Sequence, residues 1–187
     1  MAIRSVLIFG DPVLRQKAGP ITEFGEGLSA LAADLRETMK AYDGVGLAAN
    51  QVGVAQRILV VDVPLEDETR ARHTIVNPTI VSRSGSETAE EGCLSIPGIY
   101  EDICRSSALE VTGQDEHGRP LTIEAKGFLA RAIQHEVDHL DGVLFVDRLS
   151  PLKRQFLKKS LEALARGELP EGYGPKTGRA RAADHDL

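Results

Sequence analysis

The sequence predicts an α+β fold, and two observations lead to this class. Segments with helical and strand-like patterns do not alternate strictly along the chain, and a turn at His117-Gly118 joins two alternating stretches into an antiparallel hairpin. The 187 residues fit one domain with a sizeable core, because 42% are hydrophobic and 27% are charged. We expect residues 1–168 to form this domain and residues 169–187, which are polar and rich in Gly and Pro, to be a flexible C-terminal tail.

The N-terminal part is predicted to be irregular at first and then helical. Turn signals interrupt residues 1–25, whereas apolar residues recur with a helical period over residues 28–39. The following stretch, residues 44–54, has too many glycines for a helix. Such a stretch indicates backbone that lies close to another group.

The middle of the chain is predicted to be mostly strands. Residues 57–63 form a continuous apolar run typical of a buried strand. Residues 73–83 are strand-like with a break at Asn77-Pro78, and residues 109–125 are the predicted hairpin.

The C-terminal part returns to a helical pattern. Apolar positions over residues 127–140 predict a buried helix. A last helix is predicted to begin after Ser150, which is a suitable N-cap, with Pro151 at the first helical position. The apolar face of this last helix is expected to comprise Leu152, Phe156, Leu161 and Leu164.

The composition argues against several classes of protein. The net charge of −6, the lack of a long basic block and the absence of Trp argue against a protein that binds DNA or RNA. No apolar run approaches the roughly 20 residues that cross a membrane, and the N-terminus lacks a secretory pattern. We therefore expect a cytoplasmic protein whose two cysteines, Cys93 and Cys104, are reduced.

The pentapeptide HEVDH, residues 135–139, is the main candidate for a functional site. His135 and His139 are four residues apart, so they share one face of a helix and can both bind one metal ion at about 2 Å. Glu136 is displaced by about 100° of helix rotation, which is close enough to reach a water molecule on that metal. A solvated polar face is the alternative, but the apolar neighbours favour a buried helix whose histidines need partners.

A catalytic metal site needs a third protein ligand and one open position. The acidic residues and His185 downstream of His139 have no convincing setting, whereas Cys93 offers a thiolate, a strong ligand for divalent iron or zinc. A buried small hydrophobic residue is the commoner role of a cysteine, and we expect it for Cys104. Two other functions stay open: a zincin-like endopeptidase, and a non-catalytic module whose metal is enclosed by both cysteines and both histidines.

Four segments of the chain resemble the peptide deformylase family. GVGLAANQ (44–51), EGCLS (91–95) and HEVDHLDG (135–142) are similar in order and approximate spacing to its three signature motifs. GDPVLR (10–15) is similar as well, so the resemblance covers about residues 1–166. It implies a single catalytic domain in which antiparallel sheets pack around a central helix that carries the HExxH motif.

The resemblance also implies the reaction and its main residues. The family removes the N-formyl group from the formylmethionine of newly synthesised polypeptides and releases formate. Cys93, His135 and His139 match the metal ligands, with Fe(II) as the typical ion and zinc or nickel as replacements. A metal-bound water attacks the formyl carbon, and Glu136 serves as general base and then as general acid.

The remaining site residues are implied in the same way. The side-chain amide of Gln51 and the backbone N–H of Leu94 are expected to donate hydrogen bonds to the oxyanion. Gly44 and Gly46 permit close approach of the backbone, so that the Gln51 amide projects inward. Val45, Ala132 and the stem of Arg131 match the apolar slot for the methionine side chain. The backbone around Gly46 and Ile99 matches the segments expected to pair with the peptide as a strand does.

Two surface features have both a plain and a functional interpretation. Asp138 either orients a ligand histidine or is a solvated helical acid. Basic residues surround the apolar face of the last helix, and charge runs of this kind are usually solvated. The functional interpretation, implied by the resemblance, is a salt-sensitive contact with ribosomal RNA near the nascent chain. The residues concerned are Lys153, Arg154, Lys158 and Lys159.

Overall fold

The computed structural model describes residues 2–65 and 68–176. The helices are α1 (Glu26–Ala41), α2 (Gly127–Leu140) and α3 (Pro151–Ala165). The strands are β1 (Gly46–Ala48), β2 (Ile58–Pro64), β3 (Arg70–Ser84), β4 (Glu87–Cys93), β5 (Ile96–Arg105), β6 (Ala108–Gln114) and β7 (Pro120–Lys126). Short 3-10 helices occur at η1 (Pro12–Arg15), η2 (Ala49–Val52) and η3 (Phe145–Arg148).

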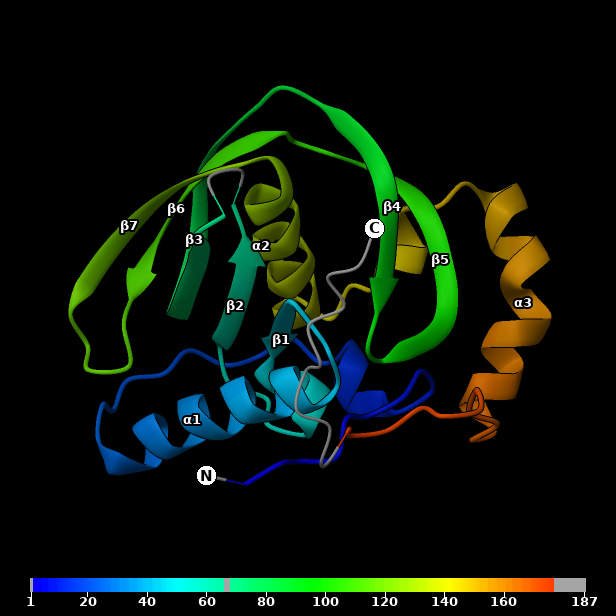
Figure 1. Cartoon of the computed structure of the whole chain (residues 1–187), viewed down its shortest axis with the longest axis horizontal. Coiled ribbons are helices and arrows are strands. Elements are labelled where there is room, and N and C mark those ends of the chain that lie inside the picture. Colours follow the sequence, from blue (N-terminus) through cyan, green and yellow to red (C-terminus); the bar gives the residue numbers. More distant parts are fainter. Residues whose placement is uncertain (1, 66–67, 177–187) are drawn as a thin grey trace, which may run out of the picture.

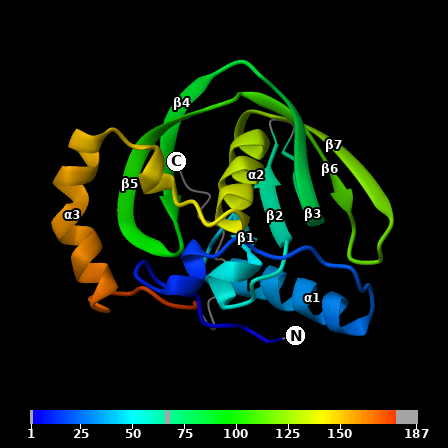
Figure 2. The ribbon, with the colours of Figure 1, turned by 180° about the vertical axis from the view of Figure 1, so that it is seen from behind.

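Two antiparallel sheets enclose α2. The larger sheet has the strand order β1-β2-β3-β6-β7, and β4 pairs with β5 in a separate two-stranded sheet. Figure 1 shows α2 in the centre, with the larger sheet on one side and the β4–β5 hairpin on the other, and Figure 2 shows the same order from behind. The predicted α+β class with a central helix is therefore confirmed. No helix in the described ranges is long and apolar enough to cross a membrane.

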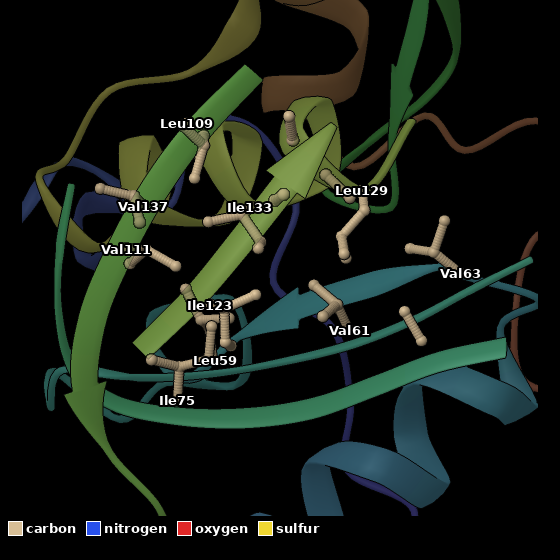
Figure 3. Close-up of a cluster of buried hydrophobic side chains, with 14 of the residues drawn as sticks. Leu59, Val61, Val63, Ile75, Leu109, Val111, Ile123, Leu129, Ile133 and Val137 are labelled. Atoms are coloured by element: carbon tan, nitrogen blue, oxygen red, sulfur yellow. The ribbon is translucent and has the colours of Figure 1, made fainter. Parts of the chain in front are cut away.

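The main core lies between α2 and the larger sheet. Leu129, Ile133 and Val137 are spaced four residues apart, so they form one stripe along the helix. Figure 3 shows this stripe facing apolar side chains of the strands. These strand residues include Leu59, Val61, Ile75, Val111 and Ile123. The stripe fixes the rotation of α2, and His135, two residues after Ile133, is turned by about 200° from it, toward the hairpin.

Most predicted elements are present with small changes in their bounds. The helix predicted over residues 28–39 is α1, the strand at 57–63 is β2, and the hairpin at 109–125 is β6–β7. The predicted break at Asn77-Pro78 is a bulge inside a continuous β3, because the register with β6 shifts between Val76 and Thr79 and Asn77 has φ of 50°.

Two features differ from the sequence expectation. Residues 87–105 form the β4–β5 hairpin, which the pattern did not predict as a pair of strands. The apolar face of α3 is also divided: Leu161 and Leu164 are buried, whereas Leu152 and Phe156 are 63% and 77% exposed. Only the C-terminal half of this helix therefore packs on the body of the protein.

The chain after α3 returns to the body of the protein. Within the stretch expected to be a tail, residues 170–176 make contacts described below, and residues 177–187 lie outside the described residues. The flexibility of this stretch and the domain boundary at residue 168 stay predictions.

Candidate active site

Cys93, His135 and His139 converge on one point. Sγ of Cys93 lies 3.2 Å from Nε2 of His139, which lies 3.3 Å from Nε2 of His135, and all three ligand atoms are within 4.8 Å of one another. Two ligand atoms at tetrahedral angles, each about 2.0–2.3 Å from one ion, lie about 3.3–3.6 Å apart. The donor set and its spacing therefore fit one divalent metal ion.

Hydrogen bonding orients the first histidine for this role. Nδ1 of His135 donates to Oε2 of Glu91 over 3.0 Å, which leaves the Nε2 lone pair free for a metal. Although burial raises the pKa of Glu91, hydrogen bonds from His135 and Arg105 outweigh it and hold that pKa at about 2. Burial also lowers the pKa of His139, so this imidazole is neutral, the form that binds metals.

A buried ionic network holds Glu91 in place. Arg105 donates to Oε2 of Glu91 over 2.8 Å, and Arg131 donates to Oε1 over 2.7 Å. Arg105 also donates to Asp138 over 2.8 Å, and Asp138 in turn accepts from Arg148. Asp138 is thus neither bonded to a ligand histidine nor simply solvated. It binds Arg105, and Arg105 in turn binds Glu91. The network joins the hairpin to α2, which fixes Cys93 relative to the histidines.

Glu136 lies beside the ligand cluster with one carboxylate oxygen unpartnered. The residue is 4% exposed, and its Oε2 has no hydrogen-bond partner among the described residues. Burial raises the pKa of Glu136 to about 7, although a divalent cation nearby would act in the opposite direction. A carboxylate with a free oxygen and a pKa near neutrality can accept and return a proton.

Gln51 also points into the site. Its Oε1 accepts from the backbone N–H of Ala48 over 2.8 Å, so its Nε2 faces the site, 3.2 Å from Oγ of Ser95 and 3.7 Å from Sγ of Cys93. Leu94 directly follows Cys93, and its side chain packs against Gly44, where a Cβ would lie 2.8 Å from Leu94 Cδ1. The glycine-rich stretch therefore does approach other groups closely, as its sequence predicts.

A pocket of about 590 Å³ between the two sheets is lined by site residues that include Gln51, Cys93, Leu94, His135 and Glu136. Of the predicted substrate-binding residues, Val45, Gly46, Arg131 and Ala132 contribute to its lining. The Ile99 side chain is buried in a core cluster with Leu14 and Phe145, and the pairing expected of its backbone with a peptide stays a prediction. Arg131 presents mainly its stem, because its guanidinium is engaged by Glu91 and by carbonyl groups of the hairpin.

The second cysteine is separate from the cluster. Cys104 is exposed, and its Sγ lies 3.0 Å from Oγ of Ser86. Among the described residues, the group suited to a metal contains Cys93 and the two histidines but not Cys104. The alternative of a closed site with both cysteines is therefore wrong, as is the expectation that Cys104 is buried.

Known proteins match this chain over nearly its whole length. The family model described as polypeptide deformylase matches residues 3–155. A peptide deformylase of Alkalilimnicola ehrlichii is 46% identical over 181 residues, covering 96% of this chain and 100% of that protein. A crystal structure of a peptide deformylase from Legionella pneumophila aligns with a TM-score of 0.81 at 43% identity, covering 89% of this chain and 98% of that one. The crystal structure of a peptide deformylase from Thermus thermophilus aligns with a TM-score of 0.82 at 42% identity, covering 89% of this chain and 99% of that one.

The chain belongs to the peptide deformylase family. It is a peptide deformylase, an enzyme of protein biosynthesis that acts on formylated nascent peptides, and it has the cysteine and two histidines of a metal site. The resemblance seen in the sequence is confirmed, and the endopeptidase alternative loses its support.

Sequence reasoning missed Glu91 and Arg105 in this deformylase. Glu91 is two residues before Cys93 on β4, and in a regular strand residues i and i+2 point to the same face, although the register of β4 with β5 shifts between these two residues. Had the segment been predicted as a strand, the acidic residue on the metal side would have been a candidate partner for a ligand histidine. Arg105 had no signal of this kind, because it is brought in only by the pairing of β5 with β4.

Gly46→Ala is expected to lower turnover while the protein stays folded. A Cβ at position 46 would lie 2.9 Å from both Cδ and Cγ of Glu136, so the Glu136 side chain must shift from its position in the parent enzyme. Displacement of a general base by about 1 Å can cost on the order of 100-fold in rate. Formate release and the thermal midpoint should be measured together. Gly27→Ala on α1 is a matched control, since a Cβ there meets nothing within 4 Å. Equal turnover in both variants would contradict this interpretation of Gly46.

Proposed function

We propose that this deformylase hydrolyses the N-formyl group of polypeptides that begin with formylmethionine, with Fe(II) as the working metal. The observation that carries the proposal is the convergence of Cys93, His135 and His139 beside the free carboxylate oxygen of Glu136. Zinc or nickel can replace iron in the same donor set. A thiolate with two imidazoles suits all three ions, and family resemblance favours iron. We assign the catalytic domain to residues 1–168 and its location to the cytoplasm.

The metal ion and the residues of the chain contribute different steps of the reaction. When bound by the three ligands, the cation supplies Lewis acidity toward the formyl oxygen and lowers the pKa of a water molecule. Glu136 takes the proton from the attacking water at its free Oε2 and returns it to the leaving amine. The Gln51 amide and the Leu94 backbone N–H donate to the oxygen on which negative charge develops. The bond from Ala48 holds the Gln51 amide in the required orientation in advance.

The pocket beside this site suits a methionine side chain. Val45, Ala132 and the stem of Arg131 supply apolar surface for it. β1 is an edge strand of the larger sheet, so the backbone at Gly46 can pair with an extended peptide. The Ile99 side chain packs in the core and is no part of this slot.

An assay of metal and substrate together tests the proposal. The protein is purified without oxygen, its metal content is measured, and formate release is followed with formyl-Met-Ala. We expect about one iron per chain and rapid formate release. An unformylated peptide of the same sequence should not be cut. Cleavage of internal peptide bonds without formate release would overturn the assignment.

We also propose that α3 contacts the ribosome. Its exposed basic residues and the 77% exposed Phe156 form an accessible surface, in which Lys153 also forms an ion pair with Glu101 of β5. The basic residues are Lys153, Arg154, Lys158 and Lys159. A nascent chain is available only at the ribosome, and phosphate contacts would give salt-sensitive binding.

Charge reversal on α3 is expected to weaken ribosome binding and its dependence on salt. Replacing all four basic residues by Glu should lower affinity and reduce the salt slope by about one for each phosphate that is no longer neutralised. Arg83→Glu with Lys17→Glu is a control, because both residues are exposed and lie outside α3. Co-sedimentation with ribosomes at several salt concentrations measures the effect. Unchanged affinity in the α3 variant would end this part of the proposal.

A further inference from the structure

The segment after α3 folds back onto the pocket. Figure 1 shows the chain turning from the end of α3 toward the middle of the molecule. We call residues 170–176 the strap. Pro170, Tyr173 and Lys176 of the strap line the same pocket as Gly46 and Glu136. The strap therefore lies at the mouth of the site where a substrate peptide must enter.

Tyr173 ties the strap to the hairpin side of the pocket. Its hydroxyl donates to the backbone carbonyl of Leu94 over 2.7 Å. Its ring packs against that of Tyr42, with 5.6 Å between the centroids and 54° between the planes. Its own backbone N–H donates to the carbonyl of Pro170 over 3.1 Å, which forms a turn. One half-buried side chain thus contacts both walls of the pocket.

Lys176 ties the other end of the strap to the opposite wall. Its backbone N–H donates to the carbonyl of Ala41 at the end of α1 over 2.6 Å. Its side chain forms an ion pair with Asp43, and both side chains are more than half exposed. An ion pair this exposed contributes little to the stability of the closed strap. The hydrogen bonds and the ring contact therefore provide most of that stability.

A peptide and the strap need the same space. An extended peptide beside the edge of β1 runs between the segment 42–46 and the segment 92–98, and the strap crosses from one to the other. We propose that the strap competes with the substrate, closing over the pocket and opening when a peptide longer than the first two residues binds. This inference rests on the proposed function, since it assumes that the peptide lies along β1.

The contacts indicate a modest closing equilibrium. Two hydrogen bonds from the strap to the pocket walls and one aromatic pair favour a closed state by about tens to hundreds of fold, and the entropy of ordering the strap reduces this preference. An enzyme that is open only part of the time shows an apparent KM raised by the inverse of the open fraction. Removal of the strap should therefore lower KM and leave kcat unchanged.

Two truncations test the competition. One ends the chain after Leu169 and removes the strap, and the control ends it after Lys176 and keeps the strap. With a formylated tetrapeptide we expect KM about five- to tenfold lower in the first truncation and unchanged in the control. Formyl-Met-Ala, which reaches less far, should show a smaller change. An unchanged or higher KM in the first truncation would overturn the proposal, the higher value indicating that the strap belongs to the substrate site.

Two further measurements avoid dependence on a truncated chain. Tyr173→Phe removes only the hydroxyl, and we expect KM for the tetrapeptide to fall about three- to fivefold, the effect of one hydrogen bond. Amide hydrogen exchange of residues 170–176 should become faster when the deformylated product peptide is added in excess, because the peptide displaces the strap. Slower exchange would contradict competition. Formate release by the parent chain tests the proposed function separately, so that the two ideas can fail independently.

Discussion

Glu136→Gln is expected to lower kcat by about 10²- to 10⁴-fold, the range of a lost general base. Glutamine has the same shape, so it can keep the position against Gly46 and leave the ligand cluster intact. The amide cannot take a proton from water, whereas the Glu136 carboxylate can, because its Oε2 has no hydrogen-bond partner among the residues that the structure describes. Formate release and metal content should be measured on the same preparation. Loss of turnover with full metal content assigns Glu136 to proton transfer.

A neighbouring acid provides the matched control for this variant. Glu90 is an exposed carboxylate at the rim of the same pocket, so Glu90→Gln changes the local charge equally. We expect its kcat to stay within about twofold of the parent value, since exposed charges interact weakly. If Glu136→Gln retained a similar kcat, the proton would have to be taken by another group, and the proposed role would be wrong.

The elements that the sequence predicted best have one face buried in the main core. α2 is an example, because Leu129, Ile133 and Val137 repeat at a helical interval and the structure places them against the larger sheet. The bounds predicted for this helix, residues 127–140, agree with those observed. Local pattern was sufficient here because burial and periodicity favour the same structure.

The β4–β5 hairpin escaped prediction because its first strand is mostly polar. β4 reads ETAEEGC, and it lacks the alternation of apolar and polar residues that marks a half-buried strand. The strand is held by pairing with β5 and by ionic contacts of Glu91 with Arg105 and Arg131. The contact of Glu91 with Arg131 joins residues 40 positions apart in sequence, and no local pattern records it.

In the active site too, some features follow from local sequence and others depend on how distant segments pack together. The spacing of His135 and His139 on a helix is local, so the sequence predicted it directly. The position of Cys93 depends on how the hairpin packs on α2. Residue chemistry made Cys93 a candidate ligand, and the resemblance to a family favoured this role over that of a buried small hydrophobic residue. The orientation of His135 by Glu91 depends on the helix that carries His135 and on the packing of the hairpin that carries Glu91. The sequence therefore did not reveal it.

Cys93→Ala is expected to remove both the metal and the activity. The thiolate is one of three protein ligands in the described site, and loss of an outer-shell partner alone typically costs about 10- to 100-fold in metal affinity. Loss of a direct ligand should cost more, so we expect the purified variant to contain little metal and to release formate at least about 100-fold more slowly. The fold should persist, because Cys93 is small and only partly buried. Metal analysis, circular dichroism and the formate assay check these three points.

Cys104→Ala is the control for Cys93→Ala, because it removes the other cysteine thiol of the chain. Cys104 is exposed and contacts Ser86, and it lies outside the ligand cluster. The variant should therefore keep full metal content and activity. Retained metal and turnover in Cys93→Ala would mean that two imidazoles hold the ion alone. In that case the convergence of sulfur and nitrogen atoms within 4.8 Å would not be the catalytic centre.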